Sequence, residues 1–300
     1  MVVDREAGKV YLSSADFRSV AAGRSVRGAI HVFELDGEGR APSQLEHDLD
    51  GPLVPHGIDL YRGEDGERRL FVVNHPEPTA SRIEIFAIEG ERLRHLRTIE
   101  GPELVSINDI TAVGPESFYA TNDAGTAPND ALRPFRTYLR LPWSNVVYFD
   151  GDDLRFVAEG LRYGNGIAIS EDGTTLFVAE TTGRRLRVYD RNPDNGTLTE
   201  QFSEEIPSGL DNISLAPDGR LWIGSHPKLL DFVAHAEDPN AHSPSQVLRL
   251  EVRERHVRVE ELYLNDGAEL SGSSVALPVS EGRFLVGSVF EPHFLDCRLQ

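Results

Sequence analysis

The sequence has 300 residues, of which 39% are hydrophobic and 8% aromatic, enough for one large domain or two small ones. Its net charge of −19 argues against nucleic acid or an anionic membrane as a partner. A single cysteine, Cys297, excludes an internal disulfide and a cysteine-based zinc site. The sequence contains no run of about 18 apolar residues, so no membrane span is expected. Residues 1–14 lack the basic and apolar regions of a signal peptide, so the localisation stays open.

Short apolar segments with the alternation of β-strands recur along the chain. Six of them share one pattern: GKVYLSS (8–14), RRLFVVNH (68–75), ESFYATND (116–123), TTLFVAE (174–180), GRLWIGSH (219–226) and GRFLVGSVF (282–290). A further alternating run follows most of them, with glycine-containing turns between strands, as hairpins require. Only residues 127–143 could carry a helix or a lid.

Strand repeats of about 40–50 residues or slightly more are typical of a β-propeller. We therefore predict an all-β fold, a six-bladed β-propeller with four-stranded blades and a central tunnel, formed by residues 1–300 as a single domain. Two separate β-sandwiches are the structural alternative.

A second series of strands begins with polar residues. These strands are HGIDLY at His56, NDITAV at Asn108, NGIAIS at Asn165, DNISLA at Asp211 and GSSVAL at Gly272. Asn and Asp are poor strand residues. The innermost strand of each propeller blade lines the tunnel, so the starts of these strands are expected to converge at one mouth of it.

The converging side chains bring mainly amide and carboxylate oxygens, from Asn108, Asn165, Asp211 and Asn212, beside His56. Hard oxygen donors with few charges suit Ca²⁺, which takes six to eight oxygen ligands. Zinc would prefer several His or Cys residues. The alternative is that Asn and Asp cap turns at strand entrances, which explains one such residue better than four consecutive strand starts.

The order and spacing of these motifs resemble the paraoxonase/arylesterase family over nearly the whole chain. The matching stretches include PHGI, VVNHP, YATND, NGIAIS, LDNIS, LWIG and VGSVF. The resemblance implies a six-bladed propeller with two calcium ions in the tunnel, one catalytic and one structural. It also implies calcium-dependent hydrolysis of small-molecule lactones and aryl esters, with organophosphate hydrolysis as a promiscuous activity.

The resemblance assigns roles to individual residues. The ligands of the catalytic calcium would be Asn108, Asn165, Asp211 and Asn212. The structural calcium would be held by Asp109 and the backbone carbonyl of Ile58. His56 and His75 would form a catalytic dyad in which His56 takes a proton from the attacking water. The substrate pocket would contain His226, Tyr163 and Asp123, with Asp123 close to His75.

The sequence departs from the family pattern in the first blade. The family draws one Glu and one Asp for its calcium ions from a pair that opens this blade, and no such pair occurs here. Asp211 stands eight positions before the turn glycine Gly219, and eight positions before Gly8 is position zero. The pair is therefore expected at or before Met1, so that the first blade lacks the start of its N-terminal strand. Tyr163 also stands where the family has Phe.

Two other functions remain open from the sequence. One is a gluconolactonase-like sugar lactonase on the same fold. The other is a non-catalytic binding scaffold that calcium only stabilises. The fold cannot separate them, because function depends on the site. A serine hydrolase is not indicated, since the sequence contains no GxSxG motif.

Overall fold

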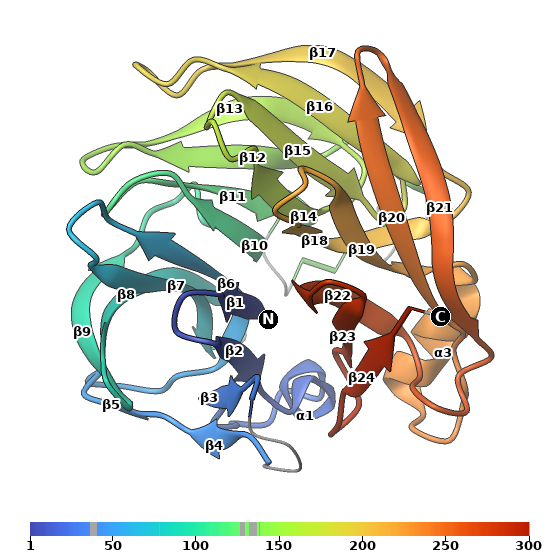
Figure 1. Cartoon of the computed structure of the whole chain (residues 1–300), viewed down its shortest axis with the longest axis horizontal. Coiled ribbons are helices and arrows are strands. Elements are labelled where there is room, and N and C mark those ends of the chain that lie inside the picture. The colour runs from blue at the N-terminus through green and yellow to red at the C-terminus, as the bar shows by residue number, and fades with distance from the viewer. Residues whose placement is uncertain (37–40, 78, 127–129, 132–136, 138, 300) are drawn as a thin grey trace.

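Six β-sheets stand around a central tunnel in the computed structural model, which describes residues 1–36, 41–77, 79–126, 130–131, 137 and 139–299 (Figure 1). Each sheet is built from consecutive strands and forms one blade. The six-bladed propeller is therefore confirmed, and the two β-sandwiches are excluded.

The described residues of the first three blades form thirteen strands. Blade 1 consists of β1 (Val2–Asp4), β2 (Lys9–Ser14), β3 (Ala29–Glu34) and β4 (Ser43–Gln44). Blade 2 consists of β6 (Pro55–Arg62), β7 (Arg68–Glu77), β8 (Ala80–Glu89) and β9 (Arg92–Ile99), and β5 (Glu46–His47) is added to its outer edge. Blade 3 consists of β10 (Ile107–Ala112), β11 (Phe118–Asn122), β12 (Ser144–Phe149) and β13 (Leu154–Leu161).

In the part of the chain that the structure describes, the last three blades have eleven strands. Blade 4 consists of β14 (Gly164–Ile169), β15 (Thr175–Glu180), β16 (Arg185–Arg191) and β17 (Leu198–Glu205). Blade 5 consists of β18 (Gly209–Leu215), β19 (Leu221–His226), β20 (Ser245–Arg253) and β21 (His256–Asn265). Blade 6 consists of β22 (Ser273–Ser280), β23 (Arg283–Ser288) and β24 (Leu295–Arg298).

The prediction of four strands per blade holds for blades 1, 3, 4 and 5. Blade 2 has five strands, because the two residues of β5 pair in parallel with the start of β9. Blade 6 has three strands within the described part of the chain. The innermost strand of blade 1, β1, is only three residues long.

The expectation that only residues 127–143 could be helical was wrong. A short helix, α1 (Phe17–Ala21), follows β2, and a longer one, α3 (Leu229–Glu237), follows β19. The Asp16 side chain caps α1 by accepting a hydrogen bond from the Ser19 amide at 3.0 Å. An Asp at this position favours the start of a helix, but it follows a strand pattern directly and was overlooked. Most of residues 127–143 lie outside the described residues. In the described part of the chain, neither helix has the length or apolarity to cross a membrane.

Six apolar clusters hold the blades together, one between each pair of neighbouring blades. Between blades 2 and 3, for example, Phe71 packs with Phe118. The cluster of Val10 and Leu285 closes the ring between blades 1 and 6. Arg5 strengthens this closure by donating hydrogen bonds to two carbonyls at the end of β22. The inner strands are therefore fixed from both sides, and the ends that line the tunnel are held in place.

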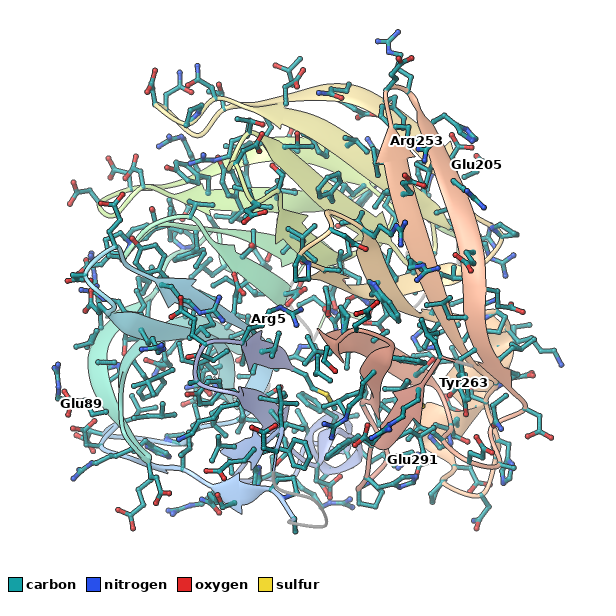
Figure 2. All side chains as sticks on the ribbon, in the orientation of Figure 1. Arg5, Glu89, Glu205, Arg253, Tyr263 and Glu291 are labelled. Carbon is teal, nitrogen blue, oxygen red and sulfur yellow. The ribbon has the colours of Figure 1, made fainter. Side chains whose placement is uncertain are left out.

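Charged side chains lie mainly on the outer strands and turns. Glu89, Glu205 and Arg253 are exposed at the rim, whereas Arg5 lies near the centre of the ring (Figure 2). The acidic excess is thus largely a property of the outer surface.

Candidate functional site

Each of the inner strands β6, β10, β14, β18 and β22 has a β-bulge at its polar start. In β10, for example, Ile107 pairs with Asn122 and Ile110 pairs with Ala120. The two residues between the pairs on β10 therefore face a single residue on β11. A bulge interrupts the alternation of side chains and re-aims those it contains. The extra residues fall at His56–Gly57, Asn108–Asp109, Asn165–Gly166, Asp211–Asn212 and Ser274. Six of the predicted site residues are therefore bulged residues of inner strands: His56, Asn108, Asp109, Asn165, Asp211 and Asn212.

Glycine at two bulges lets neighbouring inner strands approach closely. A Cβ atom on Gly57 would lie 2.6 Å from the backbone oxygen of Asn108. A Cβ atom on Gly166 would lie 2.4 Å from the backbone oxygen of Asp211. Since such contacts are too short for any side chain, glycine here brings the polar ends of successive blades together.

Two amide oxygens at the bulges are buried without a hydrogen-bond partner among the described residues: Oδ1 of Asn165 and Oδ1 of Asn212. The Nδ2 group of Asn165 donates to Oγ1 of Thr181 at 3.0 Å, and that hydroxyl donates to the Leu210 carbonyl at 2.6 Å. Thr181 thus fixes the orientation of the Asn165 amide and leaves its Oδ1 without a hydrogen bond among the described residues. Buried unsatisfied oxygens are costly, and a hard cation would satisfy them, so the donor set fits calcium.

Asp211 is oriented by a histidine and an aromatic ring. His226 Nε2 lies 2.8 Å from Asp211 Oδ2, and His226 is completely buried at the end of β19. The Phe232 ring, from α3, stacks on the imidazole with a centroid distance of 3.7 Å and an angle of 22° between the planes. His226 was predicted to line the substrate pocket, and its contact is with a predicted calcium ligand. Partners of this kind orient metal ligands.

Asp109 joins blades 3 and 4. Its Oδ2 accepts a hydrogen bond from the Ile167 amide in blade 4, at 3.2 Å. Its own amide lies 3.3 Å from the hydroxyl of Thr121, which donates to the Asn165 carbonyl. Burial raises the pKa of Asp109 to about 7, although backbone hydrogen bonds from Ile110 and Ile167 lower it. A cation beside this carboxylate would favour its charged form.

The predicted dyad of His56 and His75 is brought together, with ring centroids 5.5 Å apart. On its other side, the His56 ring lies 4.8 Å from the ring of Phe17, the first residue of α1. Burial lowers the pKa of His56 to about 3, and the charges of His75 and the Met1 amino group act in the same direction. The His56 ring is therefore neutral near pH 7 and able to accept a proton, as a weak base.

His75 is held by the next strand of its own blade. Its Nδ1 lies 3.3 Å from Oγ of Ser81, and that same hydroxyl lies 3.3 Å from the Ile107 amide at the entrance of β10. Sequence reasoning missed Ser81, because its role depends on a contact between two strands of blade 2 and the start of blade 3.

The other predicted residues lie around the same mouth. Asn108 is buried at the bulge of β10, and Ile58 pairs with Val72 just beyond the bulge of β6. Tyr163 directly precedes β14 and has a φ of 61°, unusual for a bulky side chain. Asp123 is buried after β11, and its amide donates to the Ser106 carbonyl. The closeness of Asp123 to His75 stays a prediction.

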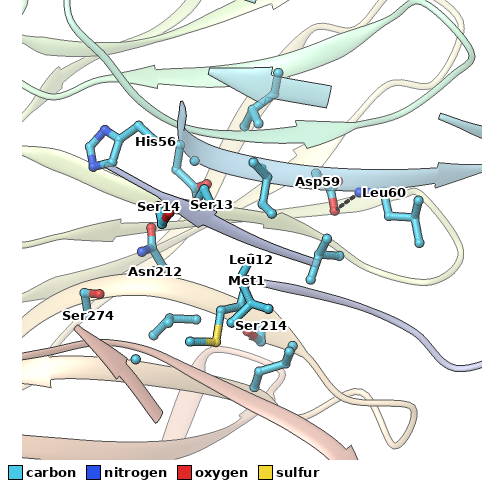
Figure 3. A pocket seen from close by; sticks show the side chains of 18 of the residues that line it. Met1, Leu12, Ser13, Ser14, His56, Asp59, Leu60, Asn212, Ser214 and Ser274 are labelled. Atoms are coloured by element: carbon cyan, nitrogen blue, oxygen red, sulfur yellow. Dashed lines mark hydrogen bonds between the residues drawn. The ribbon is translucent and has the colours of Figure 1, made fainter. Parts of the chain in front are cut away.

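A cavity of about 1450 Å³ follows the tunnel. Figure 3 shows His56, Asn212 and Ser274 at one end of it, with Asp59 and Leu60 farther along. The aromatic residues Phe17 and Phe290 also line this cavity. An organic molecule entering at the His56 end would therefore meet the imidazole of His56, the amide of Asn212 and an apolar wall.

A model of the arylesterase family matches residues 24–299 of this chain. The chain belongs to the arylesterase family. Among the curated relatives of this arylesterase-family chain, serum paraoxonase/arylesterase 1 of Homo sapiens is 41% identical over 274 residues, covering 88% of this chain and 75% of the relative. Serum paraoxonase/arylesterase 2 of Homo sapiens is 39% identical over 249 residues, covering 82% of this chain and 68% of the relative.

More distant solved structures share the fold of the arylesterase-family chain. A gluconolactonase from Xanthomonas campestris is 16% identical, with a TM-score of 0.55 over 98% of this chain and 88% of its own. A calcium-binding regucalcin from Agrobacterium tumefaciens is 13% identical, with a TM-score of 0.56 over 97% of this chain and 81% of its own. At these identities the likeness concerns the propeller alone.

Proposed function

We propose that this chain is a calcium-dependent hydrolase of aryl esters and lactones whose reaction takes place at the His56 end of the tunnel. Membership of the arylesterase family makes it a carboxylic ester hydrolase. The observation that carries the calcium site is the pair of buried amide oxygens without partners, on Asn165 and Asn212. They belong to neighbouring blades whose bulges the glycine at Gly166 brings together.

The catalytic ion would be held by Asn108, Asn165, Asp211 and Asn212. When bound, calcium would act as a Lewis acid that polarises the substrate carbonyl. Three of these four ligands are uncharged amides, so they leave the positive charge of the ion largely unneutralised. His226 keeps the carboxylate of Asp211 in position. A second, structural ion would be held by Asp109 and the backbone carbonyl of Ile58. The carboxylate of Asp109 already links blades 3 and 4.

His56 supplies the proton chemistry in this proposal. Its ring is neutral, and its Nδ1 is buried without a hydrogen-bond partner among the described residues. It takes the proton of the attacking water, and His75, held by Ser81, orients or relays that proton. Tyr163 and Asp123 would line the substrate pocket next to these histidines.

The proposal is tested by assaying the whole chain with phenyl acetate, a γ-lactone, an acyl-homoserine lactone, a sugar lactone and paraoxon, each with calcium and with EGTA. We expect turnover of the aryl ester and of at least one non-sugar lactone, lost in EGTA and restored by calcium. Turnover of the sugar lactone alone would instead identify a gluconolactonase-like enzyme. A melting temperature that rises with calcium while no substrate reacts would identify a binding scaffold.

A further inference from the structure

Arg18, on α1, joins three segments that are far apart in the sequence. Its Nη1 group donates a hydrogen bond to the Phe290 carbonyl at 2.8 Å, and its Nη2 group donates to the His235 carbonyl at 2.8 Å. The guanidinium carbon also lies 4.9 Å from the centre of the Phe290 ring. Arg18 therefore connects α1 with the last turns of α3 and with the loop after β23.

The side chain of His235 gives Arg18 a third contact. His235 is completely buried, and its Nδ1 lies 2.7 Å from the Ala241 carbonyl. Since a carbonyl only accepts, Nδ1 carries the hydrogen. In the neutral ring Nε2 is then an acceptor, and Arg18 Nη2 lies 3.1 Å from it. The carboxylate of Glu291, 3.2 Å from the same Nε2, could accept a hydrogen bond only from the protonated ring.

Two of the segments that Arg18 connects carry aromatic rings that contact histidines of the site. The residue before Arg18 is Phe17, whose ring lies 4.8 Å from that of His56. Helix α3 carries Phe232, whose ring stacks on that of His226 at 3.7 Å. The Phe290 ring lies beside Phe232, with 5.8 Å between centroids. A single arginine thus lies between two aromatic contacts on opposite sides of the tunnel mouth.

Both helices depend on such contacts for their position. Helix α1 has five residues and α3 has nine, lengths at which isolated helices are not stable in water. On α3, Leu230 and Val233 are exposed, so only part of the helix surface packs against the propeller. The hydrogen bonds of Arg18 are then a large share of what fixes one helix relative to the other.

We propose that Arg18 is a positioning residue of the hydrolytic site, which fixes α1 against α3 and thereby holds the rings of His56 and His226 through Phe17 and Phe232. The catalytic consequence rests on the proposed function, whereas the structural consequence does not. It follows from the contacts alone that both histidines should change environment when Arg18 is replaced.

The test replaces Arg18 with Met, which keeps an unbranched apolar stem like that of the arginine and removes the hydrogen bonds of the guanidinium. The matched control is Arg24→Met, since the Arg24 guanidinium donates its hydrogen bonds to the Ser19 hydroxyl of the same helix and, among the described residues, makes none to α3 or to Phe290. In the calcium-loaded full chain, the ring protons of the histidines are followed by NMR. Stacked aromatic rings displace such signals, so we expect those of His56 and His226 to move in Arg18→Met and to stay in Arg24→Met.

Kinetics supply the second measurement. We expect kcat for the ester to fall about ten- to a hundredfold in Arg18→Met, the range associated with small misplacements, and calcium affinity to fall by less than it does when His226 itself is replaced. Arg18→Lys should recover part of the loss, because Lys keeps the charge but lacks the planar fork of donors. It also serves as the test variant if Arg18→Met does not fold, with the same two signals expected to move by a smaller amount.

Unmoved His56 and His226 signals in a folded Arg18 variant would overturn the proposal, and so would equal movement in Arg24→Met. A folded Arg18 variant with unchanged kcat would overturn the catalytic part. Failure of the proposed function is recognised separately, because a chain that hydrolyses no ester in the substrate assay can still show both NMR shifts.

Discussion

The inner strands of blade 2 and of blades 3 to 5 all begin with a β-bulge, but the side chains at these bulges differ in their chemistry. In β10, β14 and β18 the bulge holds Asn, Asp or both, and two of the amide oxygens have no partner among the described residues. In β6 the bulge holds His56 and Gly57, and the imidazole faces a second histidine and a phenylalanine. In the proposed mechanism, β10, β14 and β18 would provide oxygens for a cation, and β6 would provide a neutral base.

The comparison shows that a repeated fold need not give a repeated function. The bulge is a property of the inner strands, fixed by the apolar clusters between blades. The side chains it presents differ from blade to blade, so one mouth of the tunnel brings amide and carboxylate oxygens together with an imidazole without any change in architecture. If this division is correct, changes in β6 should affect proton transfer, and changes in β14 and β18 should affect metal binding.

The largest effect is expected for His56→Gln. Gln keeps a polar side chain of similar length and cannot take up the proton, so lactone hydrolysis should slow by about 10²–10⁴-fold, the usual range for loss of a general base. Calcium content and melting temperature should stay close to those of the unmodified chain. Single-turnover rates and metal analysis on the same preparation measure these quantities.

The matched control is His31→Gln, a histidine that lines the same cavity but lies on β3, outside the bulges. We expect it to keep the full rate. A calcium-loaded His56→Gln chain with undiminished lactonase activity would remove His56 from the mechanism and leave blade 2 with a structural role only.

The next effect in size concerns the oxygens of blades 4 and 5. Asn165→Ala or Asp211→Ala removes one donor from the proposed ion, so calcium affinity and hydrolysis should fall together, with the rate reduced about a hundredfold or more. Titration with calcium and rates at saturating calcium measure the two quantities. Asp218→Ala, in the exposed turn at the other end of β18, is the control. Full activity with full calcium content in the Asn165 or Asp211 variant would place the ion elsewhere.

A smaller effect is expected for His226→Gln. This histidine touches Asp211, and replacement of such an outer partner typically lowers metal affinity about 10- to 100-fold. The rate at saturating calcium should fall less than the affinity does. His256→Gln, exposed at the start of β21, serves as the control. If the calcium affinity of the His226 variant were unchanged, the contact with Asp211 would be structural.

The strand pattern was sufficient to predict the propeller, because alternation and glycine turns are local and six similar segments point to six blades. The polar starts of the inner strands were also visible, since Asn108 and Asp109 are poor strand residues followed by an apolar run. The fifth strand of blade 2 was not predictable in this way. Its two residues, Glu46 and His47, take their conformation from pairing with β9, a contact that is distant in sequence.

The supporting contacts of the site could not be predicted from the sequence. Phe17 and Phe232 lie in helices inserted between strands, and each acts on a histidine of another segment. Thr181 follows an ordinary strand pattern, and its role appears only when Asn165 is placed beside it. In each case the residue matters through a partner, and spacing along the chain does not identify that partner.

The smallest expected effect separates the two regions by their response to pH. Without calcium, burial lowers the pKa of His56 to about 3 and raises that of Asp109 to about 7. Below pH 6.5 the unfolded chain protonates His56 and the folded chain does not, so His56 should reduce stability as the pH falls, by at most about 1.4 kcal/mol per pH unit. Asp109 acts in the opposite direction, because the folded chain binds its proton more tightly between pH 7 and its ordinary value of 3.8.

Denaturant unfolding at pH 7 and pH 5, in EGTA, measures this difference. His56→Gln should lose less stability on acidification than the unmodified chain, by up to about 2 kcal/mol. Asp109→Asn should lose more, since the stabilising protonation is absent. Saturating calcium should remove the contribution of Asp109, whose charged form the ion favours, and leave that of His56. Parallel pH dependence in all three chains would show that the two bulges do not differ in their preference for charge.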